Sequence, residues 1–161
     1  MYSIRLEGDT TRLLKKMREL SEIDKKGINS SSGQAIRGST LERFKQSHDP
    51  GGKLWKTSIR AASEGGKTLV NTATLRNSIR IKSDESGFAV GTNLKYAATH
   101  QFGDPGRTIR ANKSKILRFK TDGHWTSKHS VRIKIPARPF LGINQEDEKE
   151  IKGIIEDALK D

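Results

Sequence analysis

The side chains best suited to acid–base or metal chemistry in this sequence are its histidines, which are His48, His100, His124 and His129. Combined with Asp104 or Asp122, His100, His124 or His129 would suit a metal-dependent nuclease, because a bound divalent ion activates water for phosphodiester cleavage. A hydrolytic metal site usually needs more convergent carboxylates than these two, and the His-Glu-x-x-His spacing of a zinc-binding helix is absent from the sequence. We therefore expect no enzyme and no metal or other cofactor, and keep a small DNA-binding or DNA-processing (nuclease-like) protein as the alternative.

Nucleotide binding and thiol chemistry are also disfavoured by the sequence. Its glycine pairs, Gly51-Gly52 and Gly65-Gly66, do not belong to a phosphate-binding loop, because no Gly-Lys-Ser or Gly-Lys-Thr opens a helix, and Gly66-Lys67-Thr68 falls in a segment expected to be a polar loop. The chain has no cysteine, which excludes disulfides, thiolate zinc sites and cysteine nucleophiles together.

Positive charge is concentrated in the second half of the chain. The net charge is +12, and residues 91–144 carry eleven lysines and arginines against two acidic residues, whereas residues 145–161 have a net charge of −4. A basic block of this kind is typical of a surface that binds DNA or an acidic protein, although it can also serve only to keep a protein soluble. The expected contact residues are Arg107, Arg110, Lys113, Lys115, Arg118, Lys120, Lys128 and Arg132.

Length and composition indicate one domain with a modest core. The chain has 161 residues, of which 32% are hydrophobic, so much of its surface must contact water or other subunits. No segment approaches the roughly 18 apolar residues of a membrane span, and the first residues lack the pattern of a signal peptide. We expect a protein that acts in a cytoplasm, away from membranes.

Helical periodicity dominates the first part of the chain. Residues 10 to about 26 have apolar side chains at three- and four-residue steps, with Asp9 as the N-cap. Residues 27–33 are rich in Ser, Asn and Gly and predict a loop, and a second helix should carry Ile36, Leu41 and Phe44 before the turn-forming residues 48–52. Residues 57–68 predict a polar, mobile loop, and residues 69–75 a short helix or turn.

The rest of the chain predicts mainly strands. Residues 78–82 alternate in polarity and should form a hairpin with residues 88–91, followed by a short helix over residues 94–101. Extended segments follow at 108–111, 116–120 and 130–135, with a turn at 122–123. A final helix should start at the N-cap Asn144, with Asp147 completing a capping box. It should bury Ile151, Ile154, Ile155, Ala158 and Leu159.

These elements predict an α+β fold. It would have a central antiparallel sheet of about four to five strands, with N-terminal helices, a short mid-chain helix and a C-terminal helix. Within one domain, residues 1–47 would be helical, 48–76 a loop-rich connector, 77–142 the sheet with basic loops, and 143–161 the last helix.

Several large side chains are expected to anchor the core or an interface. Trp55 follows a Pro-Gly turn and could fill either the core or a pocket of a neighbouring subunit. A buried, hydrogen-bonded His100 is favoured over a catalytic one. Two prolines make residues 135–142 a rigid edge or connector that Phe140 would pin to the core, leaving Arg138 free for a carboxylate or phosphate. The expected anchors are Trp55, Tyr96, His100, Phe102, Arg138 and Phe140.

Four motifs give the sequence a resemblance to a known family. In chain order they are Phe44 with DPGGKLW at residues 49–55, LVNTATLRNSI at 69–79, VGTN at 90–93 with YAATHQFG at 96–103, and IPARPFLG at 135–142. Together they resemble the Mu-like phage virion morphogenesis family of tail-completion proteins. One departure is Ala73, where members of this family often have glycine, so the turn at this position could be built differently.

The resemblance implies a structural protein at the joint between head and tail or in the upper tail, without catalytic residues. Since a phage neck surrounds DNA, we expect a homo-oligomer, a hexameric ring that matches tail symmetry, with part of the basic segment facing the lumen or an acidic neighbour. The expected partners are the head–tail connector and tail tube proteins, and DNA in the lumen. The protein would be assembled in the bacterial host cytoplasm and reside in the neck or tail of the virion.

Overall fold

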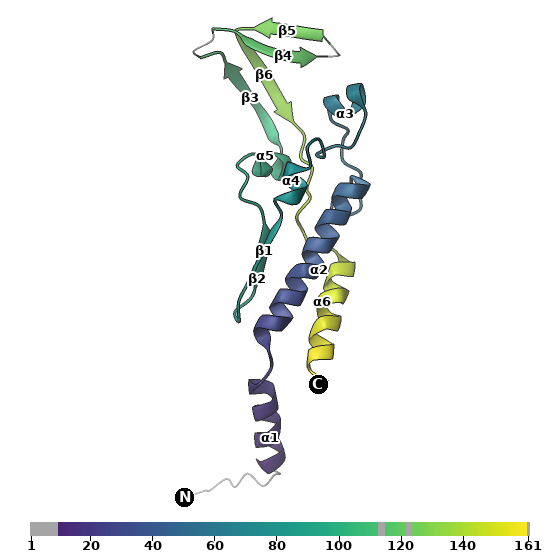
Figure 1. The fold of residues 1–161 in the computed structure, drawn as a ribbon, viewed down its shortest axis with the longest axis vertical. Helices are drawn as coiled ribbons and strands as arrows, with labels where there is room; N and C mark the ends of the chain where they lie inside the picture. Colours follow the sequence, from purple (N-terminus) through teal and green to yellow (C-terminus); the bar gives the residue numbers. More distant parts are fainter. Residues whose placement is uncertain (1–9, 113–114, 122–123, 161) are drawn as a thin grey trace, which may run out of the picture.

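The computed structural model describes residues 10–112, 115–121 and 124–160, and its mixed α+β architecture confirms the predicted class (Figure 1). The helices are α1 (Thr10–Ser21), α2 (Lys25–Gln46), α3 (Ile59–Glu64), α4 (Thr74–Asn77), α5 (Ala97–Phe102) and α6 (Gln145–Ala158). The strands are β1 (Arg80–Ser83), β2 (Phe88–Gly91), β3 (Asp104–Arg110), β4 (Leu117–Thr121), β5 (His124–Lys128) and β6 (Ser130–Ile135). Helix α2 contacts the β1–β2 hairpin and α6, while β3 to β6 extend away as a strand arm (Figure 1).

The strands form three separate two-stranded antiparallel sheets, so the prediction of one central sheet is wrong. Strand β1 pairs with β2, β3 with β6, and β4 with β5. Helix α5 separates β2 from β3, and residues 136–143 continue from β6 without strand structure. Pro136 and Pro139 lack the backbone donors that a central strand would need there. Strand β5 was not predicted, and the predicted turn at 122–123 lies outside the described residues.

Helix α2 includes residues 27–33, which the sequence predicted as a loop. Asp24 caps its first turn by accepting a hydrogen bond from the Gly27 N–H at 2.8 Å. The small residues allow close packing, since a Cβ on Gly33 would lie 2.7 Å from Cγ2 of Ile81 in β1. This contact with the hairpin outweighs the low helix propensity of glycine and serine. Helix α1 ends at Ser21, earlier than predicted, and its predicted cap Asp9 lies outside the described residues.

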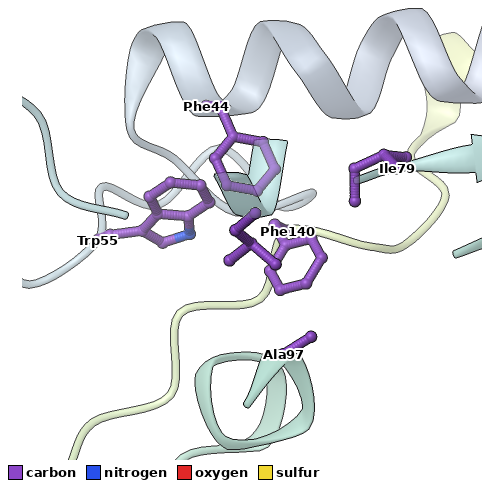
Figure 2. Packing of buried hydrophobic residues seen from close by; sticks show 6 residues of the cluster. Phe44, Trp55, Ile79, Ala97 and Phe140 are labelled. Carbon is purple, nitrogen blue, oxygen red and sulfur yellow. The ribbon is translucent and has the colours of Figure 1, made fainter. Parts of the chain in front are cut away.

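The core forms where the end of α2 meets the connector at 136–142 (Figure 2). The Phe44 ring lies edge-on to Trp55, with centroids 5.6 Å apart, and 5.3 Å from the Phe140 ring. Leu75, Ile79 and Ala97 complete this buried cluster. The Trp55 Nε1–H also donates to the carbonyl of Pro139 at 2.9 Å, which ties the connector to the segment that follows α2.

Helix α6 begins with the predicted capping box. Asn144 accepts from the Asp147 N–H at 2.8 Å, and Asp147 accepts from the Asn144 N–H at 2.9 Å. The predicted burial of its apolar side chains is only partly right. Ile151 and Ile154 are half-buried, whereas Ile155 and Leu159 are exposed.

The segment between the core and β1 is more helical than predicted. Within the expected polar loop at 57–68, Ser58 caps α3 by accepting from the Ala61 N–H at 3.2 Å. The expected helix or turn at 69–75 corresponds to α4, which starts only at Thr74, and the helix expected at 94–101 is α5. In the part of the chain that the structure describes, no helix has the length and apolar character needed to cross a membrane.

Candidate functional site

The cations predicted to contact DNA or an acidic partner lie on the strand arm, apart from Lys113, which is outside the described residues. In the β3–β6 pair, Thr108 is opposite Arg132 and Arg110 is opposite Ser130, so both arginines occupy the same face. Lys134, which the prediction omitted, shares that face by its spacing. The opposite face carries Ile109 and Ile133, and also Arg107, which is opposite Ile133. This two-stranded ribbon therefore has one basic face and one mainly apolar face that also carries Arg107.

The tip of the arm carries a second group of cations. Arg118 and Lys120 share one face of the β4–β5 hairpin with the exposed Trp125, and the Arg118 guanidinium lies 5.8 Å from the centroid of the Trp125 ring. Lys120 also lies 3.6 Å from a Glu64 carboxylate oxygen, and Arg107 lies 3.2 Å from Asp104. The Lys120–Glu64 pair is half exposed, and in the second pair Arg107 is 60% exposed although Asp104 is only 14% exposed, so both cations remain accessible to another anion.

Arg138 lies at the base of the arm and is buried, with 5% of its surface exposed. The sequence left this side chain free for a carboxylate or phosphate, and that binding role stays a prediction. Its Nε–H donates to the carbonyl of Lys56 at 2.7 Å, and burial lowers the pKa of the guanidinium. Within the described residues no carboxylate pairs with Arg138, although a buried arginine normally has such a partner. The side chain lines a pocket of about 270 Å³ together with Arg60 and His100.

His100 lines the same pocket from α5. Burial, and secondarily the positive charge of Arg138, lower the pKa of its imidazole. The sequence predicted a hydrogen-bonded ring, but the buried Nδ1 has no hydrogen-bond partner among the residues described here. The Tyr96 ring lies edge-on to the imidazole, with centroids 6.0 Å apart. The pocket is therefore lined by His100 and by two arginines, Arg60 and Arg138, and paired guanidinium groups are suited to a carboxylate.

The predicted anchors separate into two groups. Trp55 and Phe140 belong to the core of this chain, whereas Phe102 is 79% exposed and Tyr96 is also exposed. Phe102 borders a mainly apolar groove of about 460 Å³ between residues 91–98 and the connector. Exposed aromatic side chains beside an apolar groove are typical of surfaces that bind another protein.

One structural residue near this site, Gln101, was missed by the sequence reasoning, whereas the positive φ of Gly103 was expected from its place after the helix. The side-chain oxygen Oε1 of Gln101 accepts hydrogen bonds from the backbone N–H groups of Phe140 and Leu141, each at 3.0 Å. Its side-chain amide nitrogen Nε2 donates to the carbonyl of Leu141 at 2.8 Å. This side chain therefore fixes the connector to α5. Gly103 has a φ of +79°, and a Cβ at this position would lie 2.8 Å from the Ala137 nitrogen. Both residues belong to the motif at 96–103, which was the available signal.

The histidines do not converge on a metal site. In the described ranges, no group of three or more His, Asp or Glu side chains is arranged to hold a metal ion. His124 lies in β5 at the tip of the arm, whereas His48 forms hydrogen bonds with Asp49 O and Gln46 Oε1, each at 2.8 Å, near the end of α2. No observation therefore favours the nuclease alternative.

Comparison with known proteins gives two matches. The family described as the phage virion morphogenesis family matches residues 6–160. The chain is also similar to the Mu-like prophage FluMu G protein 2 of Haemophilus influenzae, with 32% identity over 128 residues, which cover 79% of this chain and 75% of the relative. No solved structure matches the chain significantly. The two matches confirm the resemblance indicated by the four motifs.

Proposed function

Because the chain belongs to the phage virion morphogenesis family, whose members are structural and generally non-enzymatic, we propose that it completes the tail or joins the tail to the head. The family match, which covers nearly the whole chain, is the observation that carries this proposal. The protein would act through surfaces that bind neighbouring virion proteins. Its proposed partners are the head–tail connector and the tail tube proteins, and its proposed location is the neck or upper tail.

We propose further that the working form is a closed ring, a hexamer that matches tail symmetry. Closed rings are built from head-to-tail contacts, in which two different surfaces of each copy meet. The strand arm supports this proposal, since each of its two-stranded sheets has edges without a strand partner in the described structure. Such edges present unpaired N–H and C=O groups with which a strand of another chain can pair.

The pocket around Arg138 and the neighbouring aromatic side chains would belong to these contacts. Arg138, His100 and Arg60 offer a carboxylate of a neighbouring protein the partner that the buried guanidinium lacks in this chain. Tyr96 and Phe102 would provide apolar area beside it. Trp55 and Phe140 would support this surface from within the core.

The basic face of the arm would face the lumen of the ring, where DNA passes, or an acidic neighbour. The shared face of Arg118, Lys120 and Trp125 supports the DNA contact, because cations bind phosphates and an exposed aromatic ring can stack on a base. The same observation would also fit a DNA-binding protein without a virion role. Incorporation into particles separates these two functions.

Labelling of purified virions with a gold-conjugated antibody tests the proposal. Gold at the junction of head and tail, or at the upper end of the tail, is the expected result. Antibody raised against an internal capsid protein serves as the control for non-specific binding to particles. Virions that contain none of this protein, while it is abundant in the infected cell, would contradict a role as a virion component.

A further inference from the structure

Among the residues that the structure describes, none covers the apolar face of α1. Leu13, Leu14 and Met17 follow helical spacing, and each is more than half exposed. Figure 1 shows α1 beyond the N-terminal end of α2, where its Lys16 and Glu19 line a cleft shared with the start of α2 and the end of α6. An isolated helix of 12 residues is only marginally stable in water. Helix α1 therefore needs a surface that covers its apolar face.

The outward face of helix α6, on the side away from α2, is also apolar and uncovered in the described structure. Its inner side lies along α2, whereas Ile143 and Ile155 are exposed on the outward side. Ile143, Ile151 and Ile155 line a shallow, mainly apolar groove of about 450 Å³. Glu148 and Glu156 border this groove, with Lys152 between them.

The charges of the two helices are opposite. Helix α1 (Thr10–Ser21) contains four lysines and arginines against one acidic residue, whereas α6 (Gln145–Ala158) contains six acidic residues against two lysines. Two copies of α1 would repel each other, and so would two copies of α6. Contact between α1 and α6 joins opposite charges around two apolar faces, so electrostatics select this pairing.

We propose that α1 of one copy docks on the outward face of α6 of a neighbouring copy. The two surfaces are different, so the contact is heterologous and repeats from copy to copy until a ring closes. This inference rests on the proposed ring and identifies one of its interfaces. Because the chain has no cysteine, engineered single cysteines can report the contact directly.

Disulfide cross-linking tests this pairing. Two single-cysteine variants of the full chain, Met17→Cys and Ile155→Cys, are given tags of different size and mixed. Mixed disulfide dimers are expected to form faster than either dimer of identical variants. Dominant Met17→Cys homodimers would overturn the inference, since they require α1 to pair with α1. A double variant that forms its disulfide within one monomer would also overturn it, because α1 would then cover the α6 of its own chain.

Oligomer size, measured by analytical ultracentrifugation, provides an independent test. Leu13→Glu and Ile155→Glu should each weaken self-association by about tenfold or more, since each places a charge on a buried apolar seam. The matched controls add the same charge elsewhere on these helices. Thr11→Glu lies away from the apolar stripe of α1, and a Cβ on Gly153 of α6 meets nothing within 4 Å, so Gly153→Glu is accommodated.

The possible failures can be told apart. If both Leu13→Glu and Ile155→Glu keep the oligomeric state of the unmodified protein, the ring proposal survives and the proposed α1–α6 contact is wrong. If the unmodified protein remains monomeric at all concentrations, alone and with tail proteins, both proposals fail. Circular dichroism checks that the variants remain folded, which is expected because Leu13 and Ile155 lie outside the buried core.

Discussion

Arg43 and Asp147 form a buried ion pair that joins α2 to α6, with an Nη2–Oδ2 distance of 2.5 Å and side-chain exposures of 2% and 3%. The other terminal nitrogen of Arg43 donates to the carbonyls of Phe140 and Gly142 at 3.3 and 2.7 Å. Asp147 also closes the capping box of α6. One carboxylate therefore starts the last helix and fixes it beside the core.

Replacement of Arg43 by methionine should strongly destabilise the fold. The change leaves Asp147 buried without its cation, which typically costs about 3–5 kcal/mol. Urea unfolding monitored by circular dichroism measures this loss. The control is Lys45→Met on the same helix, which breaks the exposed Lys45–Glu42 ion pair and should leave stability nearly unchanged. Equal losses in the two variants would contradict the role of the buried pair.

Two glycines of α2 should respond in opposite ways to substitution by alanine. Gly33→Ala places a Cβ 2.7 Å from Cγ2 of Ile81 and should destabilise the packing of the hairpin on α2 by about 1–3 kcal/mol. A Cβ on Gly38 meets nothing within 4 Å, so Gly38→Ala should stabilise the helix by about 0.5–1 kcal/mol. Thermal unfolding compares the two variants. Stabilisation by both substitutions would show that the close contact is absent.

Acid should weaken the fold through His100. Its pKa is lowered in the folded state from the ordinary value of 6.5, so the unfolded chain binds the proton more readily. The stability contributed by the neutral imidazole is thus present above pH 6.5 and is lost as the pH falls through the lowered pKa. Unfolding midpoints between pH 7.5 and pH 5 should fall less for His100→Gln than for the unmodified protein. His124→Gln, at an exposed residue, should behave like the unmodified protein.

The tip of the arm should contribute to DNA binding in a salt-dependent way. The double variant Arg118→Glu/Lys120→Glu should weaken binding and reduce the slope of log affinity against log salt concentration by about 2, because two phosphate contacts are lost. Fluorescence anisotropy over a series of salt concentrations measures both effects. The control Lys53→Glu/Lys149→Glu makes the same charge change outside the arm. If both double variants change the slope equally, the arm has no special role.

Local signals in the sequence predicted several elements correctly. Asn144 and Asp147 marked the start of α6, and the alternation around Ile79 and Ile81 marked the β1–β2 hairpin. Residues 27–33 misled the prediction, because their helical state depends on the contact between Gly33 and Ile81, which is distant in sequence. Similarly, the strands near 108, 118 and 132 were recognised individually, but periodicity does not say which strands pair.

The candidate site was also predicted only in part from the sequence. Its cations and aromatic residues were recognised by type, whereas their burial depends on tertiary contacts. In the sequence, Arg138 lies in a short segment with two prolines, and nothing there indicates that it is buried. Only the fold buries it and brings it beside His100 and Arg60. The pairing of Arg43 with Asp147 spans 104 residues, so no local pattern reports it.

Electron microscopy of particles from a phage that lacks this gene tests the central claim most directly, with the gene restored in trans as the control. The account predicts full heads separated from tails, or tails of abnormal length, and normal virions after complementation. Normal infectious virions in the absence of the protein would contradict it.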